Sequence, residues 1–113
     1  MERVVFGIDV SQGTLDIAQD GQSQVQKIAN TAAAIKRWLK EVPNGSMIAV
    51  EATGKLHVLV VRLSLAAGHQ LYVLSPRDLH FYAKSIGRRA KTDRLDALMI
   101  ARYLQREHAH LHP

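Results

Sequence analysis

The 113-residue sequence contains no cysteine, which excludes disulfides, thiolate zinc sites and cysteine nucleophiles. Any metal ion would need oxygen or imidazole ligands, a preference that points towards hard cations. No apolar run approaches the roughly 20 residues that a membrane span needs, and the first residues lack the basic, apolar and small-residue order of a signal peptide. We therefore expect a cytoplasmic protein.

Repeats, low-complexity segments and linkers are also absent, and 47% apolar residues is sufficient for one domain with one core. The net charge of +5 and the pI of about 9.9 favour a polyanionic partner. The segment KSIGRRAKTDR concentrates five basic residues: Lys84, Arg88, Arg89, Lys91 and Arg94. A solvated loop can carry such a run, but the acids beside it favour a nucleic-acid-binding segment that contacts phosphates.

Apolar periodicity and turn residues predict an α/β fold, a mixed sheet with helices on its faces in a single domain. The expected strands cover residues 4–10, 14–18, 24–28, 47–50 and 70–74. The expected helices cover about residues 31–40, 56–67, 76–84 and 92–107. The predicted element order is therefore β-β-β-α-β-α-β-α-α.

Two acidic residues stand where buried strands end. Asp9 interrupts an apolar strand in GIDVS, and Glu51 directly follows the apolar residues 48–50. A charge at such a position costs several kcal/mol if it stays unpaired in a low-dielectric setting. Each acid alone has a structural explanation, because Asp9 could cap a turn near Gly13 and Glu51 could reach solvent.

Asp93 and Asp96 lie in the last predicted helix. At about 100° per residue they are about 60° apart, and they share a face with apolar residues such as Ile100. The helix dipole favours acids in a first turn by roughly 0.3–1 kcal/mol each, but it does not explain that alignment. Four convergent carboxylates would repel one another unless a divalent cation neutralised them, and oxygen ligands suit Mg²⁺ or Mn²⁺.

Three segments, taken in order, resemble one family: GIDVSQGTLDIA, VEATG and SPRDLHFYAKSIGRRAKTDRLDALMIARYL. The family is the DEDD transposases of prokaryotic insertion sequences, related to the pilin-gene invertases, whose N-terminal domain has a RuvC-like, ribonuclease-H-like fold. The resemblance implies metal-dependent DNA strand cleavage and transfer in transposition. It also implies four catalytic and metal-binding acids: Asp9, Glu51, Asp93 and Asp96.

The sequence departs from the family at two places. It stops at Pro113, where members continue into a second domain with a serine implicated as nucleophile, so no nucleophile is assigned. Residues 1–113 are accordingly expected to be the N-terminal catalytic domain. Residues 55–57 also replace an aromatic that members often carry. The resemblance implies DNA as partner, a homo-oligomer in the full-length protein, and RNA from the element as a second partner.

Two other hypotheses fit parts of the sequence. GIDVSQGTLDIA also suits the strand-turn-strand phosphate cradle of an actin-like or sugar-kinase ATPase, although that fold needs a much longer chain and a second phosphate loop. Alternatively, the domain is a non-catalytic nucleic-acid-binding module whose acids serve only as caps. Cation binding separates the transposase from this module, and nucleotide binding would favour the ATPase.

Overall fold

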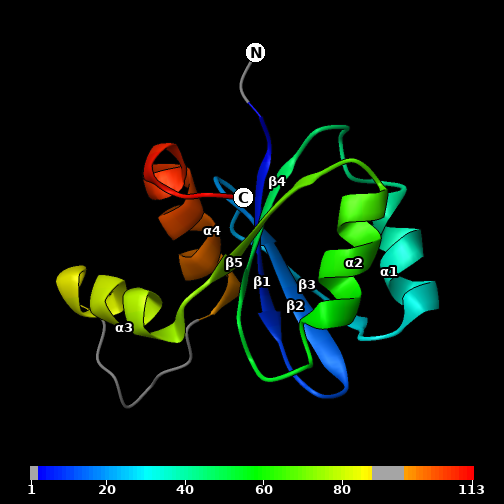
Figure 1. Ribbon diagram of the computed structural model, residues 1–113, viewed down its shortest axis with the longest axis horizontal. Coiled ribbons are helices and arrows are strands. Elements are labelled where there is room, and N and C mark those ends of the chain that lie inside the picture. The colour runs from blue at the N-terminus through cyan, green and yellow to red at the C-terminus, as the bar shows by residue number, and fades with distance from the viewer. Residues whose placement is uncertain (1–2, 88–95) are drawn as a thin grey trace.

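The computed structural model describes residues 3–87 and 96–113. The described strands are β1 (Val5–Val10), β2 (Thr14–Gln19), β3 (Val25–Ala29), β4 (Met47–Glu51) and β5 (Gln70–Leu74) (Figure 1). The helices are α1 (Ala32–Leu39), α2 (Val58–Ala66), α3 (Pro76–Ser85) and α4 (Ala97–Glu107), followed by the short 3-10 helix η2 (His108–His110). The predicted order of strands and helices is confirmed.

The strands form a mixed sheet in the order β3-β2-β1-β4-β5. Strand β1 pairs antiparallel with β2 and parallel with β4, while β5 extends the parallel side and β3 the antiparallel side. This arrangement confirms the expected ribonuclease-H-like sheet. The parallel strands β1, β4 and β5 end at the same border of the sheet, which we call the carboxyl edge.

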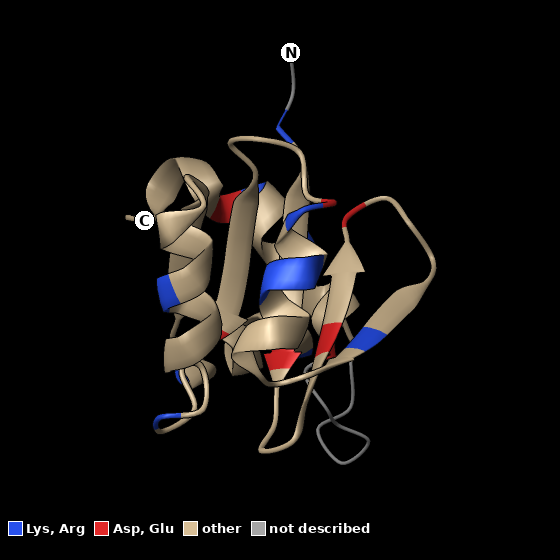
Figure 2. Cartoon of the chain, turned by 90° about the vertical axis from the view of Figure 1, so that its right-hand side faces the viewer, with Lys and Arg blue, Asp and Glu red and all other residues tan. Residues whose placement is uncertain are grey.

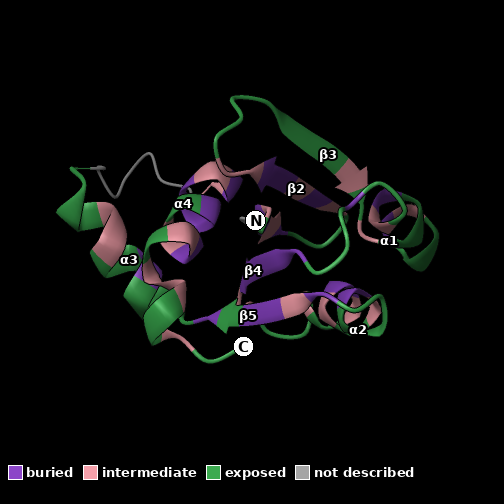
Figure 3. Ribbon diagram, turned by 90° about the horizontal axis from the view of Figure 1, so that it is seen from above, coloured by how far each residue is buried: buried purple, intermediate pink, exposed green. Residues whose placement is uncertain are grey.

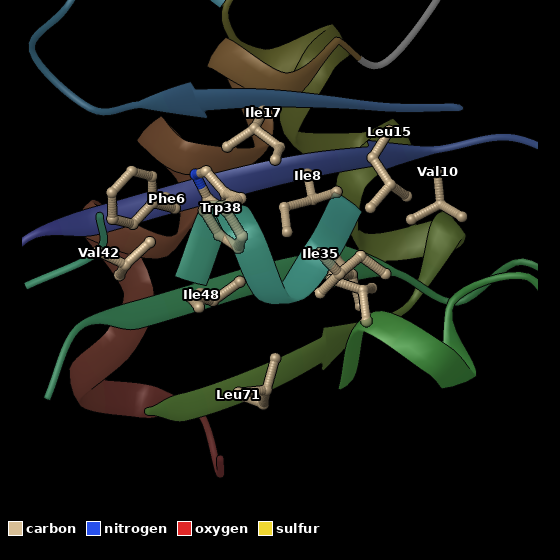
Figure 4. Close-up of a cluster of buried hydrophobic side chains, with 12 residues drawn as sticks. Phe6, Ile8, Val10, Leu15, Ile17, Ile35, Trp38, Val42, Ile48 and Leu71 are labelled. Carbon is tan, nitrogen blue, oxygen red and sulfur yellow. The ribbon is translucent and has the colours of Figure 1, made fainter. Parts of the chain in front are cut away.

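Helices cover both faces of the sheet. Seen from above in Figure 3, α1 and α2 lie on one side of the strands, and α3 and α4 lie on the other. Alternate residues of each strand therefore point to different helices. Side chains such as Ile8 and Ile48 enter an apolar cluster with Trp38 of α1 on what we call the α1–α2 face (Figure 4). The intervening residues point to the α4 face, where Ala49 and Ile100 belong to a second apolar cluster.

Local signals define several element ends. The Thr31 hydroxyl accepts a hydrogen bond from the backbone N–H of Ala34 at 3.2 Å, so the predicted cap of α1 is confirmed. Gly68 follows α2 with a φ of 91°, as predicted for the residue that closes this helix. Helix α2 starts at Val58, two residues later than expected.

The start of the last helix differs from the prediction. Asp96 has an extended backbone, with φ −77° and ψ 167°, and is the N-cap of α4, so the helix begins at Ala97. The proposed alignment of Asp96 with Asp93 on one helical face is therefore wrong for Asp96. The physical reason is that an aspartate caps a helix better than it extends one. Asp93 lies outside the described residues.

Gly7 allows α4 to lie directly on β1. A Cβ atom at this position would stand 2.3 Å from the backbone nitrogen of Ala101 and 2.4 Å from the backbone oxygen of Ala97. Both atoms belong to the helix backbone, which cannot yield as a flexible side chain does. Only glycine therefore permits so short a distance between the two backbones. This contact holds the first turn of α4 against β1 at Gly7, two residues before Asp9.

No helix in the part of the chain that the structure describes combines the length and the apolar character required to cross a membrane.

Candidate active site at the carboxyl edge

Asp9 and Glu51 come together at the carboxyl edge. Ile8 is paired with Val50 in the parallel β1–β4 ladder, so the next residue of each strand is one of the two acids. Both acids are half-buried, and both follow the alternation that points to the α4 face. Two residues from distant parts of the sequence therefore place carboxylates side by side.

The environment of Glu51 disfavours its charged form. Burial raises the pKa of Glu51 above its ordinary value of 4.5, the neighbouring Asp9 carboxylate raises it further, and His80 partly lowers it. The two main causes are those expected for adjacent carboxylates partly withdrawn from water. A cation at this position would remove the repulsion and favour both charged forms. Glu51 is half-buried, so its side chain keeps partial contact with solvent.

Asp96 stands at the start of α4 as its N-cap. Its carboxylate accepts a hydrogen bond from the backbone N–H of Met99 at 2.9 Å, which gives it the helix-capping role considered for this acid. The backbone of the next residue, Ala97, lies against Gly7 of β1, so the start of α4 is held on the α4 face of the sheet. The cap and a role beside Asp9 are compatible, since a carboxylate has two oxygens and several acceptor directions.

Asp16 is an acid at this site that the sequence pattern did not single out. It stands directly opposite Asp9 in the antiparallel β1–β2 ladder. Its carboxylate accepts a hydrogen bond from the Lys27 ammonium at 2.7 Å, and Lys27 is its partner in the β2–β3 ladder. Figure 2 shows an acidic and a basic band side by side on two neighbouring strands. Lys27 thus balances the charge that Asp16 adds beside Asp9.

His80 is a second residue that sequence reasoning missed. It is an exposed residue of α3, and it lies close enough to Glu51 for its charge to lower the pKa of that carboxyl group. In sequence it is one of several scattered histidines, and only the packing of α3 at the carboxyl edge distinguishes it. The helix that follows β5 thus brings an imidazole towards the acids.

Several predicted site residues lie outside the described residues: Arg88, Arg89, Lys91, Asp93 and Arg94. Lys84 is described and occupies the exposed last turn of α3. Within residues 3–87 and 96–113, no three histidine or acidic side chains are grouped as metal ligands. Asp9, Glu51 and Asp96 are all described, and Asp96 is not grouped with the other two. The convergence of all four predicted acids therefore stays a prediction, and the described structure supports it only for Asp9 and Glu51.

The geometry can be set beside known proteins. A family model described as "Transposase", that of the DEDD transposases of insertion sequences, matches residues 6–113. The chain belongs to the DEDD transposase family. The resemblance found in the three sequence segments is thereby confirmed, and the ATPase hypothesis loses its basis, because the same strand-turn-strand segment falls within the transposase match.

Two relatives of this transposase-family chain are pilin gene-inverting proteins. The protein of Moraxella bovis is 27% identical over 115 residues, which cover 95% of this chain and 36% of that protein. The protein of Moraxella lacunata matches with the same identity and coverage. The chain thus spans little more than a third of the length of the curated relatives it matches. The family description and the names of these relatives refer to transposition and gene inversion.

Proposed function

We propose that this chain is the catalytic domain of a transposase that cleaves and transfers DNA strands with the help of divalent cations, Mg²⁺ or Mn²⁺. Asp9 and Glu51 would hold the cation together with Asp93 and Asp96. When bound, such ions activate the attacking oxygen and stabilise the leaving one in phosphoryl transfer. The relatives' name, which describes inversion of a gene, supports a DNA substrate.

The observation that carries the proposal is the shared position of Asp9 and Glu51. Two partly buried carboxylates at one edge of a sheet destabilise each other, and the pKa of Glu51 is raised first by burial and then by the Asp9 charge. A protein that used these acids only to cap turns would gain nothing from bringing them together. Oxygen donors of this kind fit a hard cation and offer nothing to a soft one.

The chain's own residues have separate tasks in this proposal. The rigid β1–β4 ladder holds Asp9 and Glu51 at a fixed separation, so that little reorganisation accompanies cation binding. Asp96 is oriented by its hydrogen bond to Met99. The basic residues Lys84, Arg88, Arg89, Lys91 and Arg94 would contact the sugar-phosphate backbone. RNA as a second partner and homo-oligomerisation of a longer protein remain predictions.

Calorimetric titration of the chain with MnCl₂ tests the proposal. We expect binding by the unmodified chain, and a loss of at least about tenfold in affinity for Asp9→Asn, since one anionic ligand is removed. Glu51→Gln should behave in the same way. Glu41→Gln is the matched control, because it also removes one negative charge, but from an exposed position after α1. Its affinity should not change.

The same titration separates the proposal from the non-catalytic module. If Asp9→Asn and Glu51→Gln bind Mn²⁺ as well as the unmodified chain does, the acids act only as structural groups and the catalytic proposal is wrong. Circular dichroism of each variant confirms that a loss of binding does not come from unfolding.

A further inference from the structure

Phe81 is an exposed aromatic residue on a firmly anchored helix. Its relative exposure is 58%, whereas Leu79 of the same helix is fully buried. The ring of Tyr82 also contacts that of Tyr103 on α4 in an edge arrangement, with 5.1 Å between centroids. Figure 3 shows α3 extending away from the sheet with much of its length exposed. Phe81 is therefore exposed on a helix that Leu79 and Tyr82 pack against the rest of the domain.

Basic residues accompany Phe81 on α3. The Arg77 guanidinium lies over it, 5.7 Å from the centroid, and Lys84 follows three residues later. Residues 77, 81 and 84 have the spacing of one helical side, and His80 adjoins it. We call these four residues the α3 stripe: Arg77, His80, Phe81 and Lys84.

The acidic residue of α3 does not lie on the same side of the helix as the stripe. Asp78 is the acidic residue of this helix, and its charge contributes to the raised pKa of Tyr103, after the larger effect of burial. Asp78 therefore lies towards α4. The stripe thus combines an aromatic ring with basic groups, and the negative charge of the helix is directed elsewhere.

The α3 stripe begins beside the candidate active site. Helix α3 follows β5 after one residue, Ser75, which caps it at the carboxyl edge. Within the stripe, His80 lies within electrostatic reach of Glu51, and Phe81 is the next residue. The stripe therefore lies on the helix that leaves the sheet beside the acids.

We propose that the α3 stripe holds a DNA strand next to the cleavage site by stacking an unpaired base on Phe81, while Arg77 and Lys84 contact the flanking phosphates. The inference rests on the proposed function, since it assumes a DNA substrate at Asp9 and Glu51. Bases stack on exposed aromatic rings irrespective of their sequence, and arginine strengthens such platforms. Basic groups on both sides of the ring complement a polyanion, whereas an apolar protein partner would leave them without counter-charges.

Fluorescence anisotropy with a labelled single-stranded oligothymidine, at constant ionic strength, tests this assignment. Phe81→Ala should weaken binding at least about fivefold, and Phe81→Trp should restore it, because one base stacking on an aromatic ring contributes at least that much. Leu65→Ala is the matched control, since Leu65 is 55% exposed on α2, on the opposite face of the sheet. A fully paired duplex should lose less affinity than the single strand in Phe81→Ala.

Photocrosslinking identifies the contact directly. An oligonucleotide with 5-iodouracil should crosslink to Phe81, as identified by mass spectrometry of the digested adduct. Crosslinks only to other residues, or equal affinity of Phe81→Ala and the unmodified chain, would overturn the inference and leave the proposed function intact if DNA and Mn²⁺ still bind.

Three further outcomes also overturn the inference. A larger loss for a ribonucleotide oligomer than for the deoxyribonucleotide one would assign the stripe to RNA. A change of sedimentation coefficient in Phe81→Ala, without any change in DNA affinity, would assign it to a contact between protein copies. Failure of the unmodified chain to bind any DNA would contradict the inference and the proposed DNA substrate together.

Discussion

The two faces of the sheet use the same strands for different purposes. On the α1–α2 face, Ile8 of β1 and Val50 of β4 are fully buried in an apolar cluster. On the α4 face, the following residues, Asp9 and Glu51, are half-buried acids. One residue of displacement along a strand therefore separates core from candidate active site, because successive side chains point to opposite faces.

This contrast explains how a small domain can keep repelling carboxylates. The α1–α2 face buries large apolar side chains of β1 and β4, whose strands pair in parallel. Stability supplied on that face sustains unfavourable electrostatics on the other, as is common at functional sites. Changes on the two faces should therefore affect different properties of the molecule.

The largest expected effect is on the α1–α2 face. Ile8→Ala removes a fully buried side chain and should lower the free energy of unfolding by about 2–5 kcal/mol. Urea denaturation measures the change. Mn²⁺ affinity at a temperature where the variant is folded should not change, because Ile8 points away from the acids. Val73→Ala, at an exposed apolar residue of β5, should change stability far less. A large loss of Mn²⁺ affinity in folded Ile8→Ala would contradict the separation of the two faces.

Gly7→Ala should affect both properties at once, with a smaller loss of stability. The new Cβ atom would meet the α4 backbone, so the helix must move, at a cost of about 1–3 kcal/mol. Movement of α4 would also displace Asp96 and weaken Mn²⁺ binding. Gly13→Ala is the matched control, since nothing lies within 4 Å of a Cβ atom there. Unchanged stability and Mn²⁺ affinity in Gly7→Ala would show that α4 does not depend on this contact.

Local patterns were sufficient to predict most of the fold. The β-branched run before Asp9 predicts β1, the limits of β5 agree with the prediction, and Thr31 predicts the start of α1. These features depend on residues near one another in the sequence. The placement of Asp9 and Glu51 at one border of the sheet was also predictable, because each stands at the carboxyl end of a buried strand.

The remaining site features depend on contacts that periodicity does not contain. The pairing of Asp16 with Asp9 requires the register of the β1–β2 hairpin, and the position of His80 requires the packing of α3. The extended backbone of Asp96 was not predicted, because position 96 also fits the helical period of the residues that follow it. Asp96 instead accepts a hydrogen bond from Met99, and this capping decides where the helix begins.

The smallest expected effect has the opposite sign, and it concerns the α4 face. In the metal-free chain, Glu51→Gln removes a like-charge repulsion with Asp9 and should raise the free energy of unfolding by about 0.2–1 kcal/mol near neutral pH. Urea denaturation in EDTA measures it. The same variant should lose Mn²⁺ binding, so its added stability and its lost affinity have one cause.

The dependence of this gain on pH identifies its origin. The pKa of Glu51 is higher in the folded chain than its ordinary value of 4.5, so between the two pKa values the folded state binds more protons than the unfolded state. Stability of the metal-free chain therefore falls as pH rises through that interval. The amide of the Glu51→Gln variant has no proton to lose. The advantage of this variant should vanish well below pH 4.5 and grow to a constant value above the folded pKa. A gain that is equal at all pH values would instead indicate better packing of the amide, and the electrostatic contrast between the two faces would be wrong.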